Sequence, residues 1–113
     1  MSDYNLHHTE LFSRKLRKIK QHDLVGFGRV EKTLARLSSA PGESDGKMQG
    51  PHRGKLKKYA GRGGYRIIYN WCDSCRKSRH HLEGKCSSCG KIPDNSVVLH
   101  DIYHKSDAQK AGY

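Results

Sequence analysis

The fold is decided by the stretch Tyr65-Arg66-Ile67-Ile68-Tyr69-Asn70-Trp71. Its β-branched and aromatic residues are the types that favour a β-strand. Residues 61–64 before it read Gly-Arg-Gly-Gly and indicate a hairpin turn that needs positive φ. A phosphate-binding loop is the weaker reading of these glycines, because no strand-to-helix context surrounds them. Residues 52–59 then supply the partner strand of the hairpin.

Two helices are expected upstream of this hairpin. Thr9 is a suitable N-cap for the first, and apolar residues recur at helical spacing at Phe12, Leu16 and Ile19. Asp23 can cap the second helix. The apolar stripe of that helix comprises Leu24, Phe27, Val30, Leu34 and Leu37. The two stripes predict an antiparallel helical hairpin that covers one face of a sheet.

The remaining segments complete an α+β domain. Residues 4–8 predict a short first strand, and residues 96–104 (SVVLHDIYH) predict the last one. Residues 38–50 are rich in Ser, Pro, Gly and Asp and are expected to form a loop. The tail, residues 105–113, is expected to be a short helix or frayed. The predicted order is β-α-α-β-β-β with an antiparallel sheet, in a single domain of 113 residues.

The charge is strongly positive and unevenly distributed. Lys and Arg number 22 against 11 Asp and Glu, a formal net charge of +11. This density favours a polyanionic partner, normally nucleic acid, over a basic surface that only aids solubility. Residues 47–66 contain no acidic residue. The basic residues of this segment are Lys47, Arg53, Lys55, Lys57, Lys58, Arg62 and Arg66.

Neither a membrane span nor a secretory leader is indicated by the sequence. No apolar run approaches the roughly 18 residues that a spanning helix needs. The first residues, MSDYN, lack the charged start and apolar stretch of a signal peptide. We therefore expect a cytoplasmic protein without a membrane partner.

All four cysteines fall into two CxxC pairs separated by ten residues: Cys72, Cys75, Cys86 and Cys89. Two such pairs on facing turns are typical of a tetrahedral Zn²⁺ site. Two disulfides, which the cytoplasm disfavours, an iron–sulfur cluster and a redox pair are the alternatives. His80 and His81 could compete as ligands. The sequence predicts a zinc knuckle over residues 72–94, inserted between the last two strands.

The predicted zinc ion is structural. Four thiolates close the coordination sphere and leave no position for a substrate. The inserted segment has few apolar residues and several lysines and arginines, so the ion is expected to fold it. Two interpretations stay open at this point, a stapled hairpin loop and an extension of the basic surface.

A family resemblance is carried by two segments. Residues 61–69 (GRGGYRIIY) resemble the central strand of the RelE/ParE toxin superfamily, close to its HigB-like branch. Residues 98–107 (VLHDIYHKSD) resemble the closing strand of those proteins, and the two-helix start also fits. The resemblance covers the chain apart from roughly residues 73–94, where the zinc insertion departs from the family pattern. It implies a small RelE-like fold.

The resemblance also implies a function. Such proteins are toxins of type II toxin–antitoxin systems that cut mRNA on the ribosome and are neutralised by a cognate antitoxin protein. The ribose 2′-hydroxyl attacks the adjacent phosphate, without a catalytic metal. The protein must align the attack, move protons and stabilise the extra negative charge.

The resemblance assigns catalytic roles to particular residues. Arg66 matches the strand arginine that would hold the phosphate through its planar fork. Lys55 and Lys57 resemble the lysine pair of RelE-like enzymes, with Lys58 as a fallback. Lys105 matches the closing-strand lysine and is expected to neutralise the transition state, and His104 beside it is a candidate acid or base. The sequence departs from the family in having no clear second arginine on the final strand.

Further candidates would contact RNA: Arg53, Lys58, Arg62, Tyr103 and Tyr113. Tyr103 or Tyr113 could stack on a base or share the proton transfer. Structural readings compete with these roles. Arg66 could be an ordinary strand arginine, the lysines generic phosphate contacts, and His104 a structural histidine. Tyr65, Tyr69 and Trp71 alternate onto one face and are expected in the core.

Two other functions compete with the ribonuclease. A ParE-like protein poisons gyrase without cutting nucleic acid. A zinc-knuckle protein that binds RNA or the ribosome would show neither cleavage nor toxicity. The lysine-rich second strand and His104 favour the ribonuclease over the gyrase poison.

Overall fold

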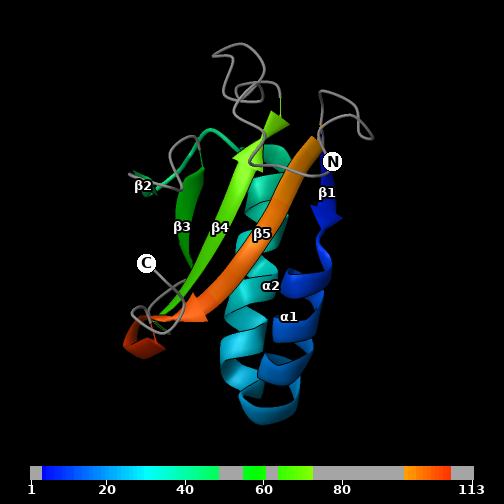
Figure 1. Ribbon diagram of the computed structural model, residues 1–113, viewed down its shortest axis with the longest axis vertical. Helices are drawn as coiled ribbons and strands as arrows, with labels where there is room; N and C mark the ends of the chain where they lie inside the picture. The colour runs from blue at the N-terminus through cyan, green and yellow to red at the C-terminus, as the bar shows by residue number, and fades with distance from the viewer. Residues whose placement is uncertain (1–3, 49–54, 61–63, 73–95, 108–113) are drawn as a thin grey trace.

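A computed structural model of the protein describes residues 4–48, 55–60, 64–72 and 96–107. These residues form two helices packed on a sheet (Figure 1). No described helix has the length and apolarity needed to cross a membrane. The elements in chain order are β1 (Asn5–His8), α1 (Glu10–His22), α2 (Leu24–Ser39), β2 (Gly46–Lys47), β3 (Leu56–Ala60), β4 (Tyr65–Trp71), β5 (Ser96–His104) and a 3₁₀ turn (Lys105–Asp107).

Both helices begin at the predicted caps. The Thr9 hydroxyl accepts the backbone N–H of Phe12 at 3.3 Å, and the Asp23 carboxylate accepts the N–H of Gly26 at 2.9 Å. The N–H of Asp23 also donates to the Ile19 carbonyl at 2.7 Å. One residue therefore ends α1 and starts α2, which confirms the predicted helical hairpin.

The sheet has five strands in the order β1-β5-β4-β3-β2, and three details of the sequence prediction are wrong. β1 runs parallel to β5, so the sheet is mixed and not wholly antiparallel. The predicted loop over residues 38–50 contains the two-residue strand β2, which pairs with β3. β3 begins at Leu56 rather than at residue 52, while residues 49–54 lie outside the described part.

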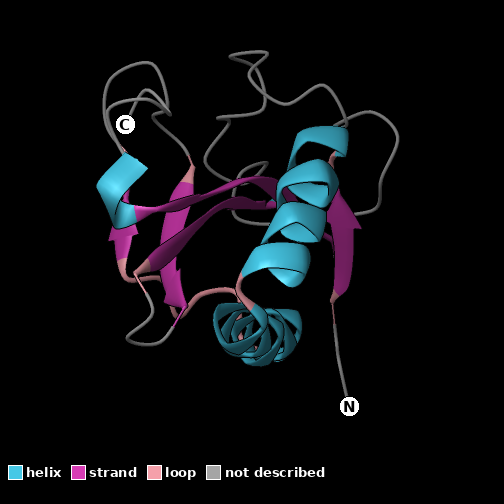
Figure 2. Ribbon diagram, turned by 90° about the horizontal axis from the view of Figure 1, so that it is seen from below, coloured by secondary structure: helices cyan, strands magenta, loops and turns pink. Residues whose placement is uncertain are grey.

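The core lies between the helices and one face of the sheet (Figure 2). Tyr69 is fully buried, and Tyr65 and Trp71 pack against the same cluster, as predicted. The buried members of the cluster are Phe12, Ile19, Val30, Leu34, Leu37, Ala60, Ile67, Tyr69, Val97, Leu99 and Ile102. Strand residues that alternate with these core residues point to the opposite side of the sheet, which is called the outer face.

A β-bulge in β5 sets which residues reach the outer face. Tyr69 pairs with Leu99 and Ile68 with Asp101, so His100 has no partner in the register. The extra residue resets the alternation, and Leu99 and Ile102 both join the core although they are three residues apart. Tyr103 consequently points to the outer face.

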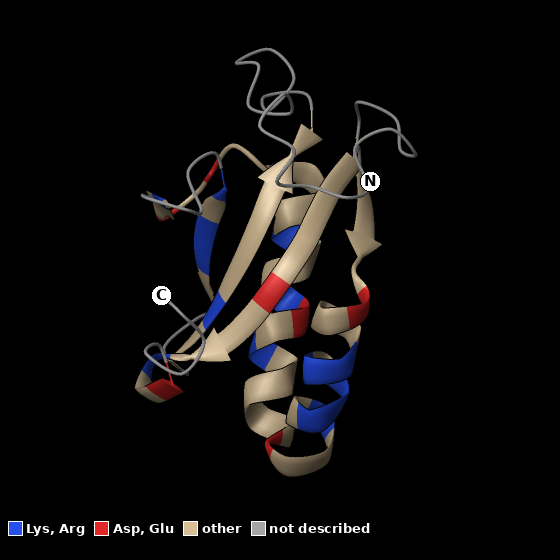
Figure 3. Ribbon diagram, viewed as in Figure 1, with Lys and Arg blue, Asp and Glu red and all other residues tan. Residues whose placement is uncertain are grey.

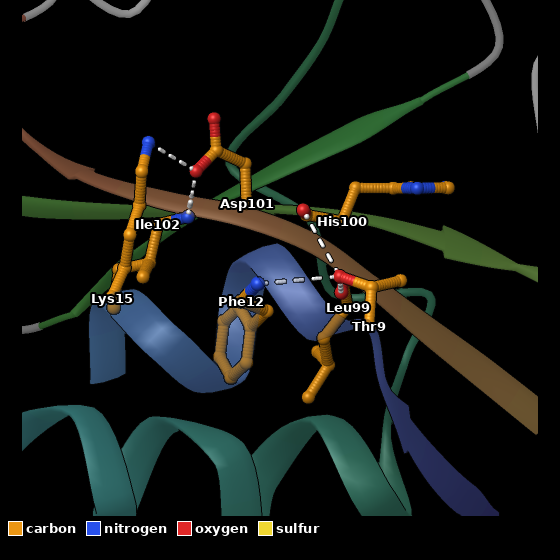
Figure 4. A network of polar contacts seen from close by, with 7 residues as sticks. All are labelled: Thr9, Phe12, Lys15, Leu99, His100, Asp101 and Ile102. Atoms are coloured by element: carbon orange, nitrogen blue, oxygen red, sulfur yellow. Dashed lines mark hydrogen bonds and ion pairs between the residues drawn. The ribbon is translucent and has the colours of Figure 1, made fainter. Parts of the chain in front are cut away.

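Polar contacts from α1 hold this bulge in place. The Thr9 hydroxyl lies 2.7 Å from the Leu99 carbonyl oxygen, to which it donates. Lys15 Nζ lies 2.7 Å from Asp101 Oδ1, and the N–H of Ile102 donates to the same oxygen at 2.8 Å. Figure 4 shows these two donors converging on one carboxylate oxygen. The bulge is therefore tied to the first helix.

Candidate functional site

Three side chains from β3 and β4 meet on the outer face. Arg66 and Tyr59 are directly opposed in the register, and the guanidinium carbon lies 4.4 Å from the centre of the Tyr59 ring. Lys57 Nζ lies 5.4 Å from the same ring centre. Arg66 and Lys57 therefore both make cation–π contacts with the Tyr59 ring. Arg66 and Lys57 are partly exposed, so a phosphate can approach both.

Tyr103 joins these residues from β5. It pairs with Arg66 across the sheet and is 8% exposed. Burial raises the pKa of Tyr103 above its ordinary value, and the nearby Arg66 charge offsets part of that rise. The hydroxyl is thus protonated at neutral pH and can donate a hydrogen bond. Lys57, Tyr59, Arg66 and Tyr103 are called the Arg66 cluster.

Gly64 orients the arginine from the turn before β4. Its φ is +86°, a conformation that glycine adopts readily and other residues rarely. Its carbonyl accepts a hydrogen bond from an Arg66 guanidinium nitrogen at 3.0 Å and from the backbone N–H of Lys105 at 2.7 Å. The predicted turn with positive φ is confirmed at this glycine.

His104 lies on the opposite side of the sheet from Arg66. It pairs with Tyr65 in the register, their ring centres are 5.3 Å apart, and its Nδ1 lies 2.8 Å from the Ser106 hydroxyl. A pocket of about 520 Å³ opens here between α1 and the end of β5. Its lining residues are Lys15, Lys18, Ile19, His22, Tyr65, Ile102, Tyr103, His104 and Asp107.

A carboxylate reaches the same region from the helix junction. Asp23 accepts the Tyr65 hydroxyl at 3.0 Å. The N–H of Gly26 and this hydroxyl lower the pKa of Asp23. Burial, followed by the Asp23 contact, raises the pKa of Tyr65. Asp23 and Tyr65 thus form a fixed polar pair beside His104.

The predicted lysines are placed differently from one another. Lys57 belongs to the Arg66 cluster. Lys58 alternates to the helix side, where Nζ donates to the Glu43 carbonyl at 2.7 Å and lies 3.8 Å from the Asp45 carboxylate. Lys58 therefore does not share the face of Arg66. Lys55 precedes β3, and its carbonyl accepts the N–H of Met48 at 2.9 Å.

Two predicted site residues lie directly after strands. Lys105 is exposed in the 3₁₀ turn after β5, and Cys72, which follows β4, is 5% exposed. The other predicted residues lie outside the described part of the chain: Arg53, Arg62, Tyr113, Cys75, Cys86 and Cys89.

The charges visible on the described ribbon agree with a basic surface. Figure 3 shows Lys and Arg along α1, on β3 and at the start of β4.

Tyr59 is the member of the Arg66 cluster that the sequence did not predict. Strand alternation with Lys57 was the available signal, because residues two apart share a face.

Comparison with known proteins identifies the fold. No known family model matches the chain, and no curated relative does. The chain resembles the RelBE2 toxin–antitoxin complex from Mycobacterium tuberculosis, with 21% identity, a TM-score of 0.61, and coverage of 95% of this chain and 97% of that chain. It also resembles the YoeB dimer from Staphylococcus aureus, with 13% identity, a TM-score of 0.58, and coverage of 91% and 99%.

The YoeB–YefM complex from Staphylococcus aureus is similar as well, at 11% identity and a TM-score of 0.56, with coverage of 89% of this chain and 97% of that chain. Likeness at these identities shows the fold. The expected small RelE-like α+β fold is therefore confirmed, with two helices on a sheet that is five-stranded and mixed rather than wholly antiparallel.

Proposed function

We propose that this protein is the toxin of a type II toxin–antitoxin pair and that it cleaves mRNA on the ribosome in the cytoplasm. The observation that carries the proposal is the Arg66 cluster. It places two cations and the largely buried Tyr103 on neighbouring strands of the outer face, in a fold shared with known toxins.

In the proposed mechanism, Arg66 binds the scissile phosphate. Its N–H groups donate hydrogen bonds to the non-bridging oxygens. These bonds stabilise the negative charge that develops on the oxygens as the 2′-hydroxyl attacks. Gly64 and Tyr59 fix the guanidinium before the substrate arrives. Lys57 adds a second positive charge from the neighbouring strand. This preorganisation removes the need to reorient donors during the reaction.

Tyr103 is the proposed proton donor. Its raised pKa keeps the hydroxyl protonated, and its place opposite Arg66 puts it beside the bound phosphate. The bond from phosphorus to the 2′-oxygen forms and the bond to the 5′-oxygen breaks. Tyr103 donates its proton to the departing 5′-oxygen, and the 2′-hydroxyl loses its proton to water. The products are a 2′,3′-cyclic phosphate and a free 5′-hydroxyl.

His104 has a supporting role in this proposal. Its side chain faces Tyr65 and Ser106 on the helix side of the sheet, away from the Arg66 cluster. We assign it to packing of the β5 end rather than to the proton transfer. The predicted acid–base role would require the ring to leave both contacts.

We also propose that the four cysteines bind a structural zinc ion. The donor set is four cysteines, and the described one, Cys72, is buried where β4 leads into residues 73–95. Among the residues that the structure describes, no three potential ligands gather, and the other three cysteines lie outside them. Bound by all four thiolates, zinc would fold the insertion and leave the chemistry to the Arg66 cluster.

Induced expression tests the function. Wild type should arrest growth and leave mRNA cut within codons, while Arg66→Ala should lose both effects. Arg17→Ala is a matched control, because it removes one exposed arginine from α1. Growth arrest with intact mRNA would indicate a gyrase poison instead of a ribonuclease. Normal growth with intact mRNA would indicate an RNA-binding protein without nuclease activity.

A further inference from the structure

A second basic surface lies on the helix side of the sheet edge. A groove of about 550 Å³ runs between α2 and β3. Arg29, Lys32 and Arg36 line it from α2, and Lys58 and Tyr59 line it from β3. None of the three α2 residues takes part in the Arg66 cluster. This surface is called the α2 groove.

The α2 residues form a regular stripe. Positions i, i+3 and i+7 share one helix face, and the three side chains are exposed. At about 1.5 Å per residue, the stripe extends roughly 10 Å along the axis. Asp45 is the carboxylate among the lining residues, and it lies 3.8 Å from Lys58 Nζ. The exposed stripe therefore presents three positive charges to a ligand.

Tyr59 connects this groove to the Arg66 cluster. It lines the groove, it is 41% exposed, and its ring lies under the Arg66 guanidinium. β2 pairs only with Leu56 and Lys57 in the register, and at Tyr59 the backbone N–H of β3 donates to the Asp45 carboxylate at 2.8 Å. Within the described residues, the β3 edge at Tyr59 therefore faces one side chain and no paired strand.

We propose that the α2 groove binds the phosphate backbone of the same RNA strand whose scissile phosphate lies at Arg66. The strand would cross the β3 edge at Tyr59 and continue along Arg29, Lys32 and Arg36. Charge complementarity and the shared Tyr59 carry this inference, and it rests on the proposed ribonuclease function. It adds a substrate-binding surface outside the catalytic cluster.

The groove predicts a measurable salt dependence. Each phosphate contact with a single strand contributes about −0.7 to the slope of log K against log [salt]. A variant with Arg29→Gln, Lys32→Gln and Arg36→Gln should therefore have a slope shallower by about 2. Its affinity at about 0.1 M salt should fall by roughly 100-fold. Each single substitution should give about a third of the slope change.

The test uses the full chain and RNA that cannot be cut, made with a 2′-deoxy nucleotide at every position where cleavage would occur. Two lengths are compared, about 4 and about 16 nucleotides, the range that single-strand-binding domains cover. The triple variant should lose affinity for the long RNA and bind the short one like wild type. Glutamine keeps the helix, and an unchanged thermal midpoint shows that the variant folds.

A matched control removes the same charge elsewhere. Arg14→Gln, Arg17→Gln and Lys20→Gln change three exposed positions of α1, and this variant should keep more affinity for the long RNA than the groove variant. Equal losses in the two variants would overturn the inference, because net charge would then explain both. Unchanged affinity for the long RNA would also overturn it.

Two further outcomes separate the inference from the function on which it rests. Weaker binding to ribosomes with unchanged binding to the long RNA would assign the groove to ribosomal RNA and reject the proposed strand path. If wild type cuts no mRNA but the length-dependent loss persists, the ribonuclease proposal fails alone. If cleavage occurs without that loss, the groove inference fails alone.

Discussion

The ion pair between Lys15 and Asp101 should contribute measurably to stability, because it ties α1 to the bulge that positions Tyr103. Its N···O distance is 2.7 Å, and the exposed fractions of the two side chains are 33% for Lys15 and 6% for Asp101. In Lys15→Met, a buried carboxylate would keep the N–H of Ile102 but lose its ammonium partner.

The magnitude follows from this geometry. A hydrogen bond to a charged group contributes about 1.5–3 kcal/mol, and breaking a fully buried pair costs about 3–5 kcal/mol. Because Lys15 is one-third exposed, water and salt screen part of the interaction. We therefore expect a loss of about 2 kcal/mol, which lowers the thermal midpoint by about 8 °C for a chain of this size.

Circular dichroism during thermal and urea unfolding would measure the loss. The variants are made in an Arg66→Ala background so that the cells survive expression. Arg17→Met is the control, since it removes a positive charge from an exposed position of the same helix. A double-mutant cycle with Asp101→Asn should give a coupling energy of about 2 kcal/mol. If Lys15→Met lowers stability no more than Arg17→Met, the ion pair with Asp101 makes no specific contribution.

Three other predictions follow. Gly64→Ala should lower stability by about 1–2 kcal/mol in urea unfolding, because alanine is strained at positive φ and its Cβ would lie 2.7 Å from His104 Nε2; no loss would contradict the turn geometry. Thr9→Val should lower stability by about 1–2 kcal/mol in the same measurement, because it removes both the helix cap and the hydrogen bond to the Leu99 carbonyl; unchanged stability would show that neither contact contributes. Metal analysis of purified protein should find one zinc per chain, and Cys72→Ser should reduce it; a metal-free folded wild type would reject the proposed ion.

The helices and the central strand could be predicted because their signals are local. Two apolar stripes and the caps Thr9 and Asp23 define the helical hairpin, and a run of β-branched and aromatic residues defines β4. β2 has only two residues and depends on pairing with β3, so it leaves no periodic signal. The parallel direction of β1 is set by long-range pairing with β5, which residues 4–8 do not encode by themselves.

The site was harder to predict because its members come together through register. Tyr103 and His104 are neighbours in the sequence and must point to opposite faces of the sheet. Which of them faces Arg66 is decided by the bulge at His100. The α2 groove did leave a readable signal, since Arg29, Lys32 and Arg36 repeat at helical spacing, but its neighbour β3 is revealed only by the fold.

Cleavage of mRNA on purified, programmed ribosomes by wild type and by Arg66→Ala would test whether the Arg66 cluster is catalytic. We expect fragments with 2′,3′-cyclic phosphate ends, formed about 100- to 1,000-fold more slowly by the variant. A 2′-deoxy nucleotide at the cut position should abolish the product. Equal cleavage by Arg66→Ala, or cleavage that survives the 2′-deoxy substitution, would contradict the claim that the Arg66 cluster performs this reaction.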